Sequence, residues 1–160
     1  MTPFPTIAEA ATELAARRIS PVELTRHCLD RIEKLDPAIN AFLLQTPERA
    51  LADARAAEAR FMAGTPRGKL DGIPIAHKDI YGTAGIRTTA HSRLLEHNVP
   101  TADATTVTNL AEAGTVMLGK LATHEFAIGG PGFDLPWPPA RHPWNRALFT
   151  ACSSSGTGAG

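Results

Sequence analysis

A helix that ends at a glycine and passes directly into a buried apolar run is the feature that most constrains the fold. Residues 102–114 carry apolar side chains at helical spacing, and Gly114 at their end is typical of a helix terminus. Residues 115–118 follow as a short apolar strand. Helix, glycine and buried strand in this order indicate a layered arrangement of helices against a sheet. We therefore expect an α/β fold.

The N-terminal part of the chain shows helical periodicity throughout. Thr6 and Glu9 have the spacing of a capping box at the start of a first helix. A second helix should end at Asp36, because Pro37 follows it and the residue before a proline avoids helical dihedrals. The pattern predicts helices over residues 6–18, 20–36 and 46–62. We accordingly divide one domain into a helical layer at 1–64 and the start of an α/β core at 65–160.

Composition excludes several classes of partner. The 160 residues are enough for one domain with a core, which takes roughly 100–150 residues. Sixteen basic and sixteen acidic residues leave no net charge, so neither nucleic acid nor a membrane is expected as a partner. The two cysteines suggest no disulfide framework and no metal site, and we expect no cofactor. With no secretory leader and no apolar run near the ~18 residues of a membrane span, the expectation is a cytoplasmic protein.

Lys78 stands in an unexpected place. Residues 73–80 read as a buried strand between glycine and proline signals, yet His77, Lys78 and Asp79 lie within it. A lysine is almost never fully buried unless it is paired or functionally needed, and burial favours its neutral form. One interpretation is that Lys78 points outward and pairs with Asp79. The other is that it is a catalytic base.

The chain closes with SSSGTGAG over residues 153–160, which is either a flexible tail or a tight catalytic loop. A serine hydroxyl is a weak nucleophile that needs a base, and a buried neutral lysine can be that base. Residues 129–144 contain five prolines and both tryptophans, which favours an ordered loop over a linker. Histidines are the usual competing bases, and we interpret those available as surface or structural residues: His77, His91, His124 and His142.

Several stretches occur in one order: GIPIAHKD at 72–79, AGTVMLGK at 113–120, EFA at 125–127, PWN at 143–145 and SSSG at 153–156. In this order and spacing the sequence resembles the amidase signature family. The helical start also resembles these enzymes, with SPVELT at 20–25 and DPAINAF at 36–42. The resemblance covers almost the whole chain. It implies that the chain forms part of a mixed-sheet α/β/α amidase-signature fold and that this fold is truncated here.

The resemblance also implies a chemistry, the hydrolysis of a small-molecule amide through an acyl-enzyme by a Ser-cisSer-Lys triad. Lys78 matches the lysine, and Ser153 matches the middle serine with its cis peptide. The nucleophilic serine of the family has no match within this chain, so the 160 residues alone are expected to be inactive. The remaining matched residues are the supporting loop, Ser154, Ser155 and Gly156, and a wall of the acyl pocket, Ala127, Ile128, Gly129 and Gly130.

The sequence departs from the family before the serine run. Two glycines are usual there, and this chain has Ala151 and Cys152. Cys152 is an alternative nucleophile, although the motif uses its position to shape the backbone.

Other interpretations remain open. The chain resembles the amidase subunit of a tRNA-dependent amidotransferase, but FDLPWPP at 133–139 is closer to stand-alone amidases. GTGAG at 156–160 is a weak dinucleotide-binding pattern without the following helix and acidic residue. A non-catalytic remnant is the last alternative. Apolar edges left by missing strands predict aggregation or a homodimer.

Overall fold

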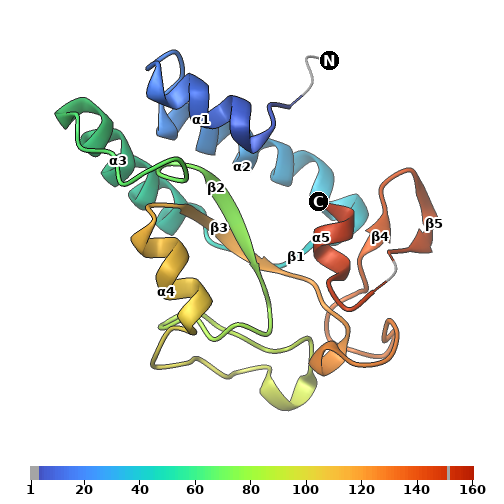
Figure 1. Cartoon of the computed structure of the whole chain (residues 1–160). Coiled ribbons are helices and arrows are strands. Elements are labelled where there is room, and N and C mark those ends of the chain that lie inside the picture. The colour runs from blue at the N-terminus through green and yellow to red at the C-terminus, as the bar shows by residue number, and fades with distance from the viewer. Residues whose placement is uncertain (1–3, 151) are drawn as a thin grey trace. The chain divides into compact units, whose positions relative to one another are not determined.

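A computed structural model describes residues 4–150 and 152–160. Figure 1 shows α-helices and β-strands interspersed along the chain, which confirms the expected α/β class. In chain order the elements are α1 (Ile7–Ala15), α2 (Pro21–Ile39), β1 (Phe42–Gln45), α3 (Pro47–Ala63), β2 (Pro74–Lys78), η1 (Arg93–Leu95), α4 (Thr105–Glu112), β3 (Val116–Leu121), η2 (Glu125–Ala127), β4 (Arg141–His142), β5 (Asn145–Phe149) and α5 (Ser155–Ala159).

The helix starts follow the capping signals in the sequence. The capping box of Thr6 and Glu9 is present at the start of α1, as predicted. The predicted end of the second helix at Asp36 was wrong, because α2 continues to Ile39 with Pro37 inside its last turn. The Asp36 carboxylate accepts hydrogen bonds from the backbone N–H groups of the two residues that follow Asn40, at 2.7 and 3.1 Å. These bonds stabilise the last turn and its exit into β1, which offsets the missing proline donor.

The sheet has the strand order β1-β3-β2. β1 pairs antiparallel with β3, and Gln45 lies opposite Gly119. The Val116 N–H donates to the Ile73 carbonyl, and the Asp79 N–H donates to the Leu121 carbonyl. Residue numbers therefore increase in the same direction along the two paired segments. β2 is therefore parallel to β3, and the sheet is mixed. β1 lies within the N-terminal stretch expected to be helical, so that stretch contributes a strand as well as helices.

The chain forms two compact units that alternate along the sequence. The first unit comprises Met1–Asp30, Thr46–Ile75 and Asn109–Leu118, and the second comprises Arg31–Gln45, Ala76–Thr108 and Gly119–Gly160. In the first unit one buried hydrophobic cluster includes Ala10, Leu14, Leu24 and Ile73. The division at residue 64 into a helical layer and an α/β core stays a prediction.

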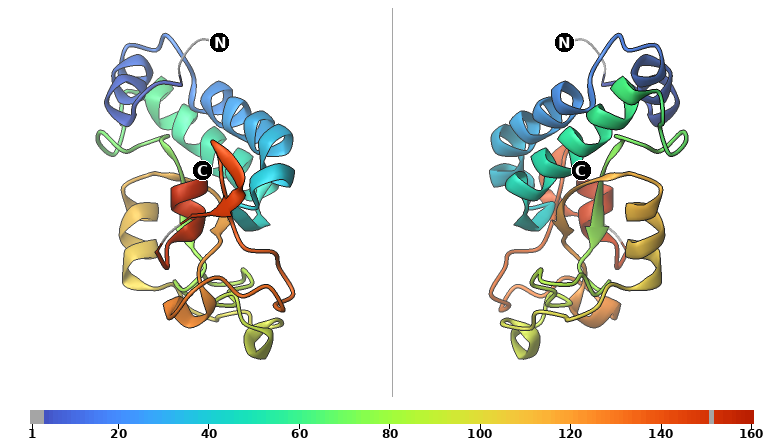
Figure 2. Two further views of the ribbon diagram at one scale, coloured as in Figure 1. Left: turned by 90° about the vertical axis from the view of Figure 1, so that its right-hand side faces the viewer. Right: turned by 90° about the vertical axis from the view of Figure 1, so that its left-hand side faces the viewer.

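The core of the second unit is built from alanines, namely Ala41, Ala122, Ala140 and Ala159. Small side chains let backbone segments approach closely, and α5 contacts β4 in this unit, as both views of Figure 2 show. β4 and β5 form a two-stranded antiparallel hairpin. The alanine core therefore holds the C-terminal segment next to the residues around 122, which positions the site described below.

Candidate active site

Lys78 and Ser153 meet in the second unit. The Lys78 Nζ atom donates a hydrogen bond to the Ser153 Oγ atom at 2.8 Å, although 75 positions separate the two residues in the sequence. Lys78 is the last residue of β2, and both side chains are half-buried. The interpretation that Lys78 pairs with Asp79 was wrong, because Asp79 forms an ion pair with Lys120 instead.

The segment that follows β3 holds Ser153 in place. The Ser153 carbonyl accepts a hydrogen bond from the Thr123 hydroxyl at 2.7 Å and another from the His124 backbone N–H at 3.2 Å. Three positions later, the Gly156 N–H donates to the Ala122 carbonyl at 2.9 Å. The residues around 122–124 and 153–156 therefore run side by side, and Ser153 is fixed through its backbone as well as its side chain.

The cis peptide expected at Ser153 is absent, since the peptide bonds among residues 4–150 and 152–160 are all trans. A non-proline cis bond costs about 3 kcal/mol and persists only where the surroundings require it. Here Cys152 turns the chain with a φ of 76°, and the Ser153 hydroxyl reaches Lys78 with a trans peptide. Cys152 thus adopts the left-handed conformation that a glycine takes freely at this position. Ala151 lies outside the described residues.

The rest of the serine run starts a helix, which excludes the flexible-tail interpretation for residues 152–160. Ser154 is the N-cap residue of α5, and its carbonyl accepts a hydrogen bond from the Thr157 N–H. Ser155 is buried, and its carbonyl accepts the Thr150 hydroxyl at 2.8 Å. A Cβ atom on Gly156 would clash with the backbone of Ala41 and Ala122. Glycine at 156 is therefore required by the close approach of three backbone segments.

The residues expected to form an acyl-pocket wall begin at Ala127, the last residue of η2, and continue into the segment that follows it. Phe126 and Ala127 both have positive φ, and Ile128 is 76% exposed. The His124 Nδ1 atom lies 2.9 Å from the Gly129 carbonyl oxygen. At Gly130, a Cβ atom would have no neighbouring atom within 4 Å. Because His124 also bonds Ser153 through its backbone, this histidine links the 127–130 segment to the serine.

A buried ion pair beside the site was missed by the sequence interpretation. The Lys120 side chain is fully buried, and its Nζ atom lies 3.3 Å from the Asp79 Oδ1 atom. Burial lowers the pKa of Lys120, and the Asp79 carboxylate opposes that shift. The signal was available, since a lysine at the end of a buried apolar strand is as unexpected at 120 as at 78.

Cys152 is exposed and lies next to the catalytic candidates. Its thiol pKa is lowered by hydrogen bonds from the backbone N–H groups of Ser154 and Ser153, and the charge of Lys78 lowers it further. The thiolate is therefore favoured more than in an ordinary exposed cysteine.

The proline-rich loop is ordered by contacts with the rest of the second unit. The His91 Nε2 atom lies 3.0 Å from the Trp137 carbonyl oxygen, and the two rings meet edge to face. The Arg87 guanidinium lies over the Trp137 ring at 5.4 Å. The His142 ring accepts a hydrogen bond from the Trp144 N–H. His91, His124 and His142 all make contacts of a structural kind.

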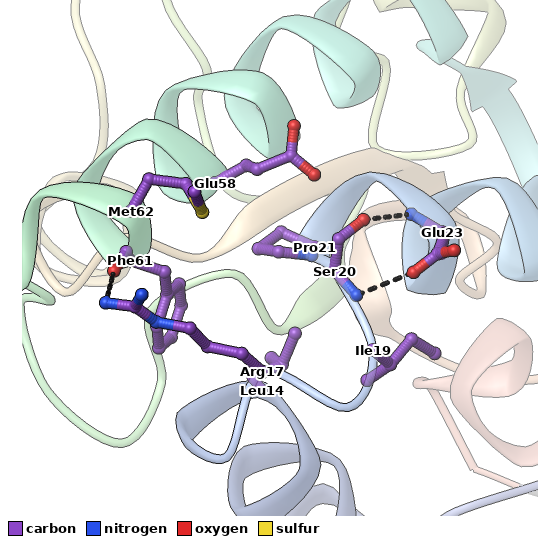
Figure 3. Close-up of a pocket in the computed structure, with 9 residues that line it drawn as sticks. All are labelled: Leu14, Arg17, Ile19, Ser20, Pro21, Glu23, Glu58, Phe61 and Met62. Carbon is purple, nitrogen blue, oxygen red and sulfur yellow. Dashed lines mark hydrogen bonds between the residues drawn. The ribbon is translucent and has the colours of Figure 1, made fainter.

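A cavity of about 400 Å³ lies in the first unit, and Figure 3 shows its lining. Apolar side chains of α1 and α3 form much of it, including Leu14 and Phe61. The Arg17 guanidinium donates a hydrogen bond to the Phe61 carbonyl. The Ser20 N–H donates to the Glu23 carboxylate, and the Glu23 N–H donates to the Ser20 hydroxyl. The cavity contains none of the predicted site residues. In the described part of the chain, no cluster of three or more potential metal ligands occurs and no helix could cross a membrane.

A family model described as Amidase matches residues 23–160. The chain belongs to the amidase family. This amidase-family chain is 47% identical over 154 residues to a Glutamyl-tRNA(Gln) amidotransferase subunit from Geobacter metallireducens, covering 96% of this chain and 32% of that relative. The native peptide amidase from Stenotrophomonas maltophilia superimposes with a TM-score of 0.86 at 31% identity, covering 98% of this chain and 34% of the peptide amidase.

A second solved structure has the same fold. It comes from a vestigial protein complex that bears on the origins of an s-triazine catabolic enzyme, and it matches with a TM-score of 0.91 at 34% identity. That comparison covers 97% of this chain and 34% of the other. The amidase-family chain thus spans about a third of the length of each relative.

Proposed function

We propose that this chain supplies two of the three groups of an amide-hydrolysing serine triad, with Lys78 as the base and Ser153 as the relay. The observation that carries the proposal is the 2.8 Å hydrogen bond between the Lys78 Nζ atom and the Ser153 Oγ atom. A lysine can activate a distant serine through an intervening hydroxyl that lies within hydrogen-bond reach of its amine. Membership of the amidase family supports assigning this pair to amide hydrolysis.

In the proposed reaction, a nucleophilic serine attacks the amide carbonyl and gives its proton to Ser153. Ser153 passes its own hydroxyl proton to the neutral Lys78 amine along the observed contact. The resulting ammonium then returns a proton to the leaving amine, and an acyl-enzyme remains. Water hydrolyses the acyl-enzyme by the same proton route in reverse. The reaction needs no cofactor, and its substrate is a small-molecule amide.

The family's nucleophilic serine is not matched within residues 1–160, and neither Ser154 nor Ser155 takes its place. Ser155 is buried, and its carbonyl accepts a hydrogen bond from the Thr150 hydroxyl, which supports this assignment. Because the groups of such a triad act as a unit, residues 1–160 alone should have almost no activity. We also propose one amidase domain, a cytoplasmic location and the possibility of a homodimer.

The experiment is an amide-hydrolysis assay on the full-length protein with simple aryl and aliphatic amides. Lys78→Ala and Ser153→Ala should each lower kcat/KM by about a thousandfold, since general acid–base groups contribute roughly 10²–10⁴-fold. Lys69→Ala, which removes an exposed lysine, is the matched control and should leave the rate unchanged. Activity that survives Lys78→Ala, or turnover by residues 1–160 alone, would contradict the proposal.

A second candidate within the same chemistry is the release of ammonia from glutamine in a tRNA-dependent amidotransferase. The observation that favours it is the 47% identity to the Glutamyl-tRNA(Gln) amidotransferase relative. The balanced charge of the chain is weak evidence against it, because partner subunits can supply the contacts to tRNA. A glutaminase assay with and without partner subunits and charged tRNA separates the two versions. Glutaminase activity that depends on both would favour the amidotransferase over a stand-alone amidase.

A further inference from the structure

The ammonium group of Lys120 is saturated with partners inside the second unit. Its Nζ atom donates to the Tyr81 carbonyl at 2.6 Å and to the Thr88 hydroxyl at 2.7 Å. The Thr83 hydroxyl and the Asp79 carboxylate both lie at 3.3 Å. A fully buried lysine with four oxygen partners is held in one position, and the Asp79 carboxylate favours its ammonium form against the lowering of its pKa by burial.

Asp79 is held equally firmly from the other side. Its Oδ2 atom accepts hydrogen bonds from the Thr89 N–H at 2.9 Å and the Thr89 hydroxyl at 2.6 Å. Its backbone N–H donates to the Leu121 carbonyl, and its own carbonyl accepts the Ala90 N–H. These bonds fix the carboxylate and the peptide unit that joins Asp79 to Lys78.

The buried pair is adjacent to the catalytic candidate in the chain but faces away from it. Lys78 ends β2 and Asp79 begins the turn that follows it, and the two side chains have different partners: Lys78 reaches Ser153, whereas Asp79 reaches Lys120. An unpaired carboxylate one residue from a lysine base would stabilise the ammonium form of that base. Lys120 supplies the compensating positive charge at 3.3 Å from the carboxylate.

We propose that Lys120 is a positioning residue that neutralises Asp79, so that Lys78 can lose its proton and act as a base toward Ser153. The inference rests on the proposed function only where it concerns catalysis. The charge relation between Lys120, Asp79 and Lys78 stands independently of it.

Other ionisable groups act on the same residues and have to be controlled. The Cys152 thiol interacts electrostatically with Lys78, and the Asp103 carboxylate interacts with Lys120. His77 and Tyr81 flank the pair along the chain. A Cys152→Ser background removes the thiol that interacts with Lys78, and Asp103→Asn tests whether the Asp103 carboxylate also changes the Lys78 midpoint.

The experiment is a titration of the Lys78 amine by NMR of the full-length protein with ¹³Cε-labelled lysine in the Cys152→Ser background. The Lys78 signal is assigned as the one lost in Lys78→Arg. Lys120→Met should move the titration midpoint to higher pH by about one unit, because the Asp79 carboxylate is then unopposed and stabilises the Lys78 ammonium. Asp79→Asn should move the midpoint to lower pH by a similar amount, because the Lys120 charge is then unopposed.

The double variant Lys120→Met with Asp79→Asn removes both charges and should return the midpoint close to its starting value. If Lys120→Met alone does not fold, the other two variants still give different expectations. Asp79→Asn should lower the Lys78 midpoint, and the neutral double variant should leave it close to its starting value. Lys34→Met, at an exposed lysine, is the control. A midpoint unchanged in both single variants, or moved in the same direction by both, would overturn the proposal, because a structural role alone predicts lower stability without opposite shifts.

Catalysis gives a separate readout. In Lys120→Met the ascending limb of the kcat/KM profile should move to higher pH with the midpoint, which lowers kcat/KM about tenfold below that limb while KM stays unchanged. Absence of amide hydrolysis in the unmodified protein would reject the proposed function but leave the NMR test intact. An NMR shift without a matching shift in the rate profile would reject Lys78 as the base.

Discussion

Gly156→Ala is the substitution for which the structure gives the clearest energetic expectation. A Cβ atom there would lie 2.6 Å from the Ala122 backbone nitrogen and 3.0 Å from its oxygen, and it would overlap the Ala41 carbonyl oxygen. These three atoms belong to the backbone, so no side-chain rotation relieves the clash. Overpacking of this kind costs about 1–3 kcal/mol, and the displaced Gly156 N–H would lose its bond to Ala122, worth about 1 kcal/mol.

Gly158→Ala is the matched control in the same helix. Its Cβ atom would lie 3.4 Å from the Thr150 Cβ atom, which is an ordinary contact. Both substitutions gain up to about 1 kcal/mol of helix propensity, so their difference isolates the clash. We expect Gly156→Ala to be about 3 kcal/mol less stable than Gly158→Ala in urea unfolding of the full-length protein, the sum of the clash and the lost hydrogen bond. A difference below about 1 kcal/mol, the lower end of the overpacking cost, would refute the close approach of α5 to Ala122.

Two further predictions concern ionisable groups. The Asp71 carboxylate is buried and accepts a two-point ion pair from Arg60 at 2.9 and 2.5 Å, and although burial alone would raise its pKa, these bonds lower it. The pKa of Asp71 is lower in the folded state than its unfolded value of about 3.9, so ionised Asp71 stabilises the fold above that pH. This stabilisation is lost as the pH falls through the folded-state pKa. Asp71→Asn should therefore cost about 3 kcal/mol at pH 7 and much less in strong acid. Urea unfolding against pH tests this prediction. Glu13→Gln, at an exposed ion pair, is the control and should cost much less stability than Asp71→Asn; an equal loss at both sites would contradict the prediction. Second, the lowered thiol pKa of Cys152 should make it alkylate with iodoacetamide faster than Cys28 below about pH 8, as measured by peptide mass spectrometry; equal rates would contradict the assigned hydrogen bonds.

Residue types alone single out the two segments that meet at the candidate site. A lysine in an apolar strand is costly, and a serine run with alternating glycines is a poor core, so Lys78 and the run at 153–155 are both conspicuous in the sequence. The choice of Ser153 within that run comes from the resemblance to the amidase signature family. The capping box of Thr6 and Glu9 was equally readable because it depends on positions three residues apart. Membership of the amidase family follows from motifs spread over most of the chain.

Other features depended on packing between distant segments. The trans peptide at Ser153 reflects the turn at Cys152 and the bonds from Thr123 and His124, which no local pattern contains. The end of α2 beyond Pro37 depended on the Asp36 carboxylate reaching forward to the next strand.

By itself the sequence determined the α/β class and the family, because the class follows from local periodicity and the family from motifs in a fixed order. The same motifs give Lys78 and Ser153 as catalytic candidates. Only the tertiary structure decided which charges pair. Asp79 could have neutralised Lys78, its neighbour, but the turn after β2, held by the bond from the Asp79 N–H to the Leu121 carbonyl, places Asp79 against Lys120 and leaves Lys78 to Ser153. That choice is made by the pairing of β2 with β3, which sequence proximity does not reveal.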